Sequence, residues 1–150
     1  MEMSTLGLQL IRQSEGFRAN TYLDPAGIAT FGYGDRLLPR EAYPDGIAEV
    51  LAEQLLAGDV RLAELAVARL VRVVLTQGQF DALADFCFNL GAGRLSSSTL
   101  LKELNCGQYD AARAELLRWD LAAGAVEPGL KARRQAEYQL WCGAAAQAAA

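Results

Sequence analysis

The chain has 150 residues, of which 52% are hydrophobic and 21% are charged, so it is large enough to bury the core of one domain. It contains no histidine, which excludes a Ser-His-Asp triad, a Cys-His pair and any histidine-ligated metal within the chain. The formal net charge of −4 argues against a broad basic surface, so we expect no nucleic-acid partner. Acid–base chemistry must therefore come mainly from Asp, Glu, Lys, Tyr or Cys.

The first part of the chain combines a helix with a small sheet. Apolar residues at helical spacing predict a helix from Ser4 or Thr5 to about Ser14. Across residues 15–35, aromatic and β-branched residues alternate with glycines, which is typical of short strands. A turn is expected near Pro25–Gly27, so the segment predicts an antiparallel sheet of two or three strands.

The remainder of the chain is predicted to be helical. Asp45 is expected to cap a run of apolar residues that continues past Gly58 to Val67. One long helix, or two helices broken at Gly58, satisfies this pattern equally well. The capping box Thr76–Gln79 should open the most buried helix, and Pro128 should start the last one.

Three cysteines, Cys87, Cys106 and Cys142, are widely spaced and form no CxxC motif. This spacing predicts reduced, mostly buried thiols and no metal site, so we expect no cofactor. No apolar run has the length of a signal peptide or of a membrane-spanning helix, and we therefore predict neither.

Two acids and a hydroxyl stand in or beside the predicted sheet. Glu15 follows the first helix, Asp24 precedes the turn, and Thr30 lies on the returning strand. A hairpin folded over the helix end brings these side chains around one cleft. Glycosidic hydrolysis needs such a set: a protonated acid for the leaving oxygen, a charged carboxylate, and a group that holds a water. The same residues also fit a local cap and an ordinary turn, since a chain with 18 acidic residues produces such spacings by chance.

The surrounding residues resemble the catalytic segment of phage-type lysozymes, the endolysin muramidases. That segment has Glu, eight residues, Asp or Cys, five residues, Thr, and then a Gly-x-Gly turn. This chain matches it at Glu15, Asp24, Thr30, Gly32 and Gly34. The resemblance covers roughly residues 5–143 and continues in order through Leu75–Leu83, Phe88–Gly91, Ser98–Leu101 and Pro128–Arg134.

The resemblance implies a lysozyme-like α+β fold that is mostly helical. A small three-stranded antiparallel β lobe, at about 15–45, is joined by a long helix to a helical lobe at about 70–143. The two lobes form a single domain, and the Ala-rich segment 144–150 is a tail. The cleft between the lobes is expected to bind peptidoglycan.

The resemblance also implies the role of each catalytic residue. Glu15 is the general acid, Asp24 the second carboxylate and Thr30 the residue that holds the water. The implied reaction is inverting hydrolysis of the β-1,4 bond between N-acetylmuramic acid and N-acetylglucosamine. Gly32 and Gly34 form the supporting turn. No metal is required.

Further positions match family residues outside the β lobe. Phe88 and Asn89 match positions that contact the substrate. Either Arg133 or Arg134 is expected to pair with Glu15, and the sequence does not choose between them. The chain departs from the family at Asp35, where most members have histidine after the Gly-x-Gly turn; this adds a negative charge near the predicted cleft.

The implied biological role is release of phage progeny from the host cell. The enzyme is expected to be a monomer in the host bacterial cytoplasm and to reach the wall only after another protein has opened the membrane. Two alternatives remain at this point. A lytic transglycosylase needs the catalytic Glu but no second carboxylate, and an inactive peptidoglycan-binding or tail-structural module needs neither.

Overall fold

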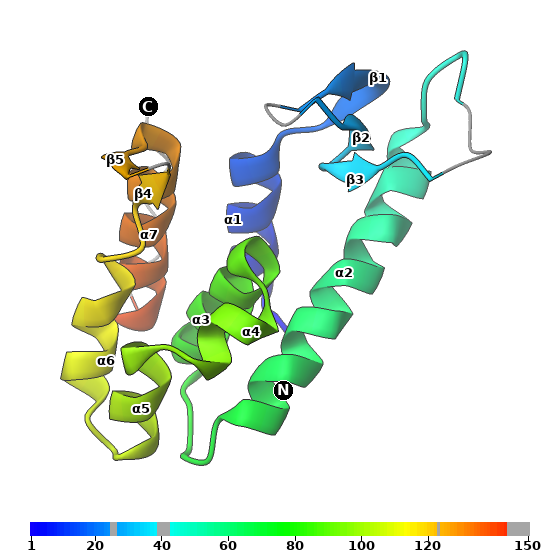
Figure 1. The fold of residues 1–150 in the computed structure, drawn as a ribbon. Coiled ribbons are helices and arrows are strands. Elements are labelled where there is room, and N and C mark those ends of the chain that lie inside the picture. The colour runs from blue at the N-terminus through cyan, green and yellow to red at the C-terminus, as the bar shows by residue number, and fades with distance from the viewer. Residues whose placement is uncertain (25–26, 39–42, 123, 144–150) are drawn as a thin grey trace. The chain divides into compact units, whose positions relative to one another are not determined.

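A computed structural model describes the whole chain except residues 25–26, 39–42, 123 and 144–150. Most of the described residues are helical, and two small sheets accompany the helices (Figure 1). The helices are α1 (Thr5–Glu15), α2 (Glu49–Leu70), α3 (Gln77–Leu90), α4 (Ala92–Ser96), α5 (Thr99–Asn105), α6 (Tyr109–Leu116) and α7 (Pro128–Trp141). The strands are β1 (Arg18–Leu23), β2 (Ala29–Gly32), β3 (Asp35–Arg36), β4 (Leu121–Ala122) and β5 (Ala125–Val126).

The chain divides into two compact units. We call residues 12–59 the sheet unit, and residues 1–11 together with 60–150 the helical unit. The long helix α2 passes from one unit into the other at Asp59 and Val60. The single-domain organisation predicted from the sequence stays a prediction.

The sheet unit contains the predicted antiparallel sheet, in the order β1-β2-β3. Tyr22 of β1 lies opposite Thr30 of β2, which in turn lies opposite Arg36 of β3. Thr30 therefore occupies the central strand. Part of the turn predicted near Pro25–Gly27 lies outside the described residues, but Gly27 donates its N–H to the Asp24 carbonyl over 2.8 Å.

Helix α2 is continuous through Gly58, so the pattern belongs to one long helix rather than two. No side chain approaches the position of a Cβ at Gly58, and the helix accommodates this glycine without a break. The predicted start was wrong. The helix begins at Glu49, whereas Asp45 lies in a turn before Gly46, whose φ of 82° no helix allows.

The core of the helical unit is centred on α3. Its predicted capping box is present: the Thr76 side chain accepts from the Gln79 N–H, and the Gln79 side chain accepts from the Thr76 N–H. Phe80, Leu83 and Phe86 of this helix are buried, and α3 packs against α7. The last helix begins at Pro128, as predicted.

Besides the start of α2, the structure differs from the sequence-based expectation in three further places. Helix α6 ends at Leu116, and a short hairpin of β4 and β5 follows in a part of the chain that was predicted to be helical. The five-residue helix α4 was not predicted. Only Cys87 is buried; Cys106 and Cys142 are exposed, so the prediction of mostly buried thiols was wrong.

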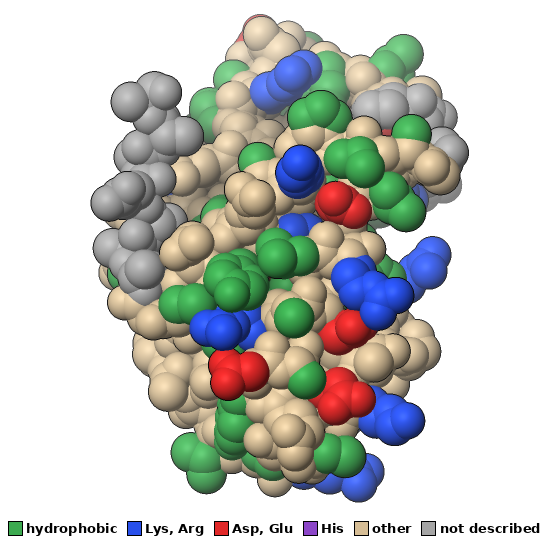
Figure 2. Space-filling view, turned by 90° about the vertical axis from the view of Figure 1, so that its left-hand side faces the viewer, with side chains coloured by type: hydrophobic (Ala, Val, Ile, Leu, Met, Phe, Trp, Pro, Cys, Tyr) green, Lys and Arg blue, Asp and Glu red, His purple; other side chains and the backbone are tan. Residues whose placement is uncertain are grey.

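Charged and apolar side chains are interspersed on the face of the helical unit that carries α6 and α7. Figure 2 shows Lys and Arg near Asp and Glu on this face, with apolar side chains between them. Leu121 and Val126, which pair in the β4–β5 hairpin, are 56% and 55% exposed. No broad basic surface is visible on this face.

Candidate active site

Glu15 is the last residue of α1, and its carboxylate faces a glycine. The Gly16 N–H donates to the Arg12 carbonyl over 2.9 Å, and Gly16 adopts a φ of 69°, which ends the helix. A Cβ built on Gly34 would lie 3.5 Å from Oε2 of Glu15. The carboxylate of Glu15 therefore lies against the turn that connects β2 and β3.

That turn depends on two glycines. Gly32 and Gly34 adopt φ values of 60° and 100°, and the Gly34 N–H donates to the Phe31 carbonyl over 3.0 Å. A Cβ on Gly32 would also come within 3.3 Å of the Cβ of Ala52 in α2. The Gly-x-Gly pattern thus serves both backbone conformation and close packing within the sheet unit.

Asp24 closes the connection between β1 and β2. Its backbone N–H donates to the Ile28 carbonyl over 2.9 Å, and the Ile28 N–H donates to Asp24 Oδ1 over 2.8 Å. The side chain is half-buried. These bonds fix the carboxylate at the end of the hairpin, as expected for Asp in a turn.

Thr30 lies on the central strand and is only 3% exposed. Its hydroxyl donates to the Ile28 carbonyl over 2.9 Å, so the same carbonyl group bonds both Thr30 and the Asp24 backbone. Because its proton is used in this way, the Thr30 oxygen is left to accept a hydrogen bond. Glu15, Asp24 and Thr30 all belong to the sheet unit, and Ile28 links the last two.

A polar network that the sequence did not predict supports the same unit. Arg12, three residues before Glu15, donates two hydrogen bonds to Glu53 of α2, over 2.8 and 2.6 Å. The hydroxyl of Tyr33, which lies between the two turn glycines, donates to the same carboxylate over 2.8 Å. The network ties the last turn of α1, the Gly-x-Gly turn and α2 to one carboxylate.

The network shifts the pKa values of its members. The hydrogen bonds from Arg12 lower the pKa of Glu53, and Tyr33 adds to that effect. The bond with Glu53 raises the pKa of Arg12, and burial raises the pKa of the Tyr33 phenol. Arg12 was recognisable as a basic residue near a helix end, but no sequence signal identified Glu53 as its partner.

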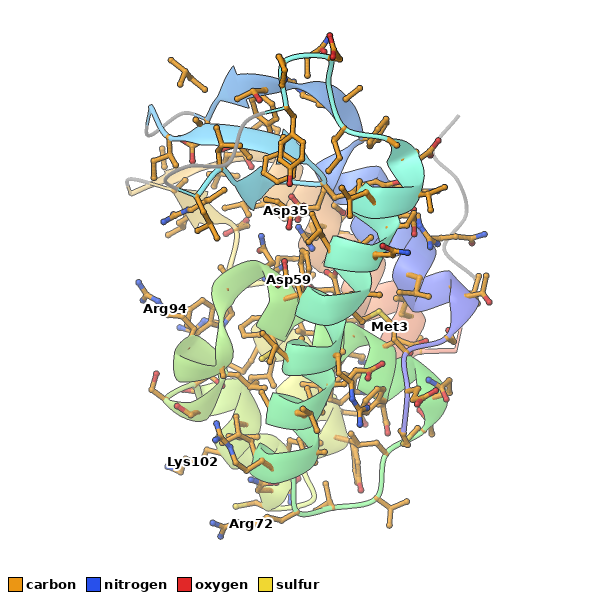
Figure 3. The ribbon with its side chains drawn as sticks, turned by 90° about the vertical axis from the view of Figure 1, so that its right-hand side faces the viewer. Met3, Asp35, Asp59, Arg72, Arg94 and Lys102 are labelled. Atoms are coloured by element: carbon orange, nitrogen blue, oxygen red, sulfur yellow. The ribbon has the colours of Figure 1, made fainter. Side chains whose placement is uncertain are left out.

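Asp35, the departure from the family pattern, projects from β3 (Figure 3). It lies opposite Phe31, and its Oδ2 would be 3.2 Å from a Cβ on Gly32. The half-buried carboxylate therefore packs against the first glycine of the turn. Any larger residue at position 32 would meet it.

Phe88 and Asn89 lie in the last turn of α3, in the helical unit. Both are half-buried. A guanidinium nitrogen of Arg134 donates to Asn89 Oδ1 over 3.0 Å. Since the amide oxygen is bonded, the amide NH₂ of Asn89 is the group oriented to donate to a ligand.

Arg133 and Arg134 both belong to buried ion pairs of the helical unit. Arg133 donates to both carboxylate oxygens of Asp85, over 2.9 and 2.8 Å. Arg134 lies 2.7 Å from Glu137. Burial lowers the pKa of Arg134, and burial together with the nearby Asp85 raises the pKa of Glu137 well above its ordinary range. The predicted pairing of Glu15 with one of these arginines stays a prediction.

The part of the chain that the structure describes contains neither a candidate metal site nor a candidate membrane-spanning helix. No cluster of three or more Cys, Asp and Glu in that part of the chain is arranged to hold a metal ion. None of its helices combines the length and the hydropathy that crossing a membrane requires.

The family model described as phage lysozyme matches residues 12–137, which include every candidate residue above. The chain belongs to the phage lysozyme family. The resemblance and the fold class predicted from the sequence are thereby confirmed. The endolysin of Bacillus phage B103 is 40% identical over 144 residues, which cover 94% of this chain and 54% of that protein. The chain thus spans about half the length of that relative.

Solved structures show the same fold. The endolysin from Escherichia coli O157:H7 phage FAHEc1 superimposes with a TM-score of 0.85 at 32% identity, covering 94% of this chain and 93% of that one. The muramidase domain of SpmX from Asticaccaulis excentricus gives a TM-score of 0.83 at 33% identity, covering 93% and 97%.

Proposed function

We propose that this chain is a lysozyme-type endolysin that hydrolyses the β-1,4 bond between N-acetylmuramic acid and N-acetylglucosamine in bacterial peptidoglycan. The observation that carries the proposal is that one compact unit of a phage lysozyme family member holds Glu15, Asp24 and Thr30. Each of the three is held by a different structural element. Glu15 lies at the end of a helix, Asp24 in a hairpin turn and Thr30 on the central strand.

In the proposed reaction Glu15 donates a proton to the oxygen of the leaving sugar. Its position at the end of α1, beside a glycine without a side chain, leaves room for a substrate oxygen near the carboxyl group. The backbone around it is held by the bonds of Arg12 and Tyr33 to Glu53. Such rigid support keeps a catalytic acid in a productive orientation.

Asp24 and Thr30 act on the opposite face of the sugar. The Thr30 oxygen accepts a hydrogen bond from the attacking water, since its own proton is donated to Ile28. Asp24 removes a proton from that water or stabilises the positive charge that develops on the sugar. Ile28 holds both groups, since its N–H donates to Asp24 and its carbonyl accepts from Thr30, so the proposed water site is preorganised. The outcome is inversion at the anomeric carbon.

Phe88 and Asn89 are proposed to bind the substrate. The amide NH₂ of Asn89 is oriented by the bond of Arg134 to its oxygen and can donate to an acyl oxygen of an N-acetyl sugar. The ring of Phe88 lies 5.8 Å from the guanidinium of Arg133, which restricts its position. A held aromatic ring of this kind suits contact with the apolar face of a sugar.

The proposal includes the biological setting predicted from the sequence. The protein would be made in the cytoplasm of the host bacterium, act as a monomer and reach the wall after another protein has opened the membrane. No cofactor takes part in the proposed reaction, so a chelator should leave the rate of lysis unchanged.

The test is a turbidity assay on bacteria whose outer membrane has been permeabilised. The Glu15→Gln variant keeps the shape of the side chain but has no proton to transfer, so lysis should fall by about 10²- to 10⁴-fold. Glu2→Gln is the matched control, because Glu2 is exposed near the N-terminus and should remain fully active. Half of the wild-type rate in Glu15→Gln would exclude Glu15 as the general acid.

A further inference from the structure

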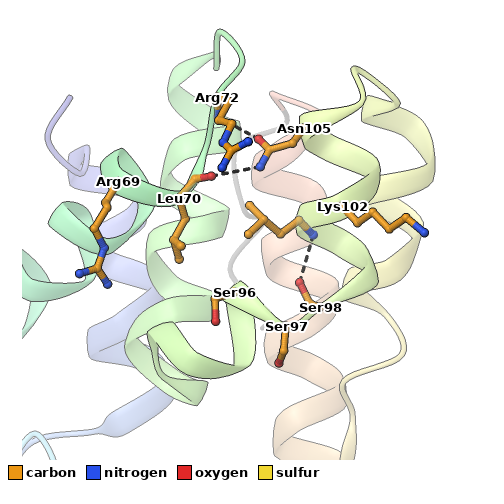
Figure 4. Close-up of a pocket in the computed structure, with 9 residues that line it drawn as sticks. Arg69, Leu70, Arg72, Ser96, Ser97, Ser98, Lys102 and Asn105 are labelled. Carbon is orange, nitrogen blue, oxygen red and sulfur yellow. Dashed lines mark hydrogen bonds between the residues drawn. The ribbon is translucent and has the colours of Figure 1, made fainter.

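A second site is suggested by a pocket of 450 Å³ that lies within the helical unit. Its wall is formed where the end of α2 meets α4 and α5. In Figure 4, Arg72 and Asn105 lie at one end and Ser96 to Ser98 at the other, with Arg69 and Lys102 on opposite sides. Leu70 and Leu101 complete the lining, so one part of the pocket is apolar.

The charge of this pocket is opposite to that of the whole chain. Arg69, Arg72 and Lys102 line it, and no acidic residue does. Among the described residues, no carboxylate forms an ion pair with any of these three side chains. Figure 3 shows Arg72 and Lys102 projecting from one side of the helical unit, with Arg94 on the same side. Three unneutralised cations around one cavity are unexpected in a chain of net charge −4.

The pocket is built around a fixed asparagine. Asn105 accepts from the backbone N–H of Arg72 over 2.8 Å and donates to the Leu70 carbonyl over 3.1 Å. These bonds hold the chain as it leaves α2, and they fix the point from which the Arg72 side chain departs. The bond to Arg72 uses only its backbone, so the guanidinium is left to bind a ligand.

The opposite end of the pocket offers hydroxyl groups. The hydroxyls of Ser96 and Ser97 are exposed, and both donate to the Gly93 carbonyl, over 2.9 and 3.1 Å. A hydroxyl rotates about its C–O bond and can donate to a bound anion instead. The pocket therefore has donors at both ends and cations on its sides.

We propose that this pocket binds a phosphate ester. An arginine guanidinium can donate two parallel hydrogen bonds to two oxygens of a phosphate group. A lysine adds a positive charge at the end of a flexible side chain. The pocket carries three positive charges, more than the single negative charge of a carboxylate would neutralise. This excess favours a phosphate group over a sugar acid. The pocket volume is in the range of small-molecule sites, so the alcohol or sugar that carries the phosphate can enter beside Leu70 and Leu101.

A phosphate ester of this kind has two sources, a soluble or polymer-bound glycerol phosphate and the headgroup of an anionic lipid. Binding at this pocket would hold the enzyme near a phosphate-bearing part of the cell envelope. This binding site goes beyond the proposed hydrolysis, because neither Glu15 nor any other residue of the sheet unit lines the pocket.

The test is an NMR titration of the protein with glycerol 3-phosphate at constant ionic strength. Saturable shifts are expected at the amides of Arg72 and Ser96 to Ser98. The double variant R72A/K102A should weaken binding about tenfold. Lys131→Ala is the matched control, because Lys131 is the other lysine of the chain and is exposed on α7. Acetate at the same ionic strength should bind more weakly than the phosphate ester.

Shifts that do not saturate, or that persist unchanged in R72A/K102A, would overturn the proposal, as would equal binding of acetate. If the arginines serve only to complement the carbonyl end of α2, the double variant lowers the melting temperature but no phosphate binding is seen in the wild type. Glu15→Gln should titrate like the wild type, so failure of the phosphate site and failure of the proposed hydrolysis are separable.

Sedimentation with vesicles separates the two sources. Binding to phosphatidylglycerol vesicles, but not to phosphatidylcholine vesicles, that is lost in R72A/K102A assigns a lipid headgroup. Equal sedimentation with both kinds of vesicle, together with saturable binding of glycerol 3-phosphate, assigns a soluble or polymer-bound ester. Phosphatidylglycerol binding that survives in R72A/K102A contradicts the proposal.

Discussion

Glu15 and Gly34 illustrate what a sequence motif reveals about single residues. The resemblance of this motif to the phage lysozyme segment predicted a catalytic acid at position 15 and a glycine turn at 32–34. It did not predict that a Cβ at Gly34 would lie 3.5 Å from the Glu15 carboxylate, because that contact depends on how the hairpin folds back on α1. The glycine is thus needed for its φ of 100° and also leaves open space beside the acid.

Thr30 provides a sharp test of the proposed water site. Thr30→Glu introduces a carboxylate where the water is proposed to lie, and this carboxylate can attack the anomeric carbon itself. The expected result is a covalent glycosyl-enzyme or a retaining outcome, detected by mass spectrometry after exposure to cell walls.

Two further variants make that experiment specific. Asp24→Asn removes a charge but adds no nucleophile, so it should slow turnover without trapping product. Thr30→Ala should also be slow, because nothing accepts the hydrogen bond of the water. A fully active Thr30→Ala, with no adduct in Thr30→Glu, would show that Thr30 is not beside the attacking water.

At the scale of elements, local signals predicted well what local interactions determine. The capping box at Thr76 and the proline at position 128 mark helix starts because their hydrogen-bond chemistry is complete within a few residues. The start of α2 and the β4–β5 hairpin were missed. Asp45 is a good cap in isolation, but Gly46 has a positive φ and donates to Tyr43, so the chain turns before it becomes helical.

Replacing either of two helical glycines with alanine is expected to change the stability of the protein in opposite directions. Gly58→Ala in α2 meets no atom within 4 Å and should stabilise the protein by about 0.5–1 kcal/mol. Gly78→Ala in α3 would overlap the Leu140 carbonyl of α7, and overpacking of this kind costs about 1–3 kcal/mol. Urea unfolding of both variants checks the signs. Equal effects of the two changes would contradict the packing of α3 on α7.

The partners of the two buried arginines of α7 were beyond sequence reasoning. The sequence indicated that Arg133 or Arg134 has a role, but both are buried, in different pairs. Arg133 is held by Asp85, and Arg134 contacts both Glu137 and Asn89. Adjacent residues of a helix point in directions about 100° apart, so small differences in helix rotation decide which partner each arginine meets.

At the scale of the whole molecule, the network around Glu53 predicts a pH dependence of stability. Its pKa is lowered in the folded protein from the ordinary value of 4.5, mainly by Arg12. The stabilisation is therefore present above about pH 4.5 and is lost as the pH falls through the lower, folded pKa. Glu53→Gln lacks this contribution at every pH.

The measurement compares the free energies of unfolding of the wild type and Glu53→Gln between pH 7 and acid. The difference should be about 1 kcal/mol near neutrality, because the carboxylate is partly exposed, and should shrink on acidification. Glu2→Gln is the control and should show no such dependence. If the difference in the free energy of unfolding stays constant with pH, the negative charge of Glu53 does not contribute to the stabilisation.

The central claim is that this chain hydrolyses the sugar backbone of peptidoglycan. Analysis of the fragments released from purified cell walls tests it most directly. The account predicts new reducing ends at N-acetylmuramic acid in the wild type and almost none in Glu15→Gln. Fragments that end in 1,6-anhydro-N-acetylmuramic acid would identify a transglycosylase, in which the sugar's own hydroxyl attacks, and would contradict the proposed roles of Asp24 and Thr30.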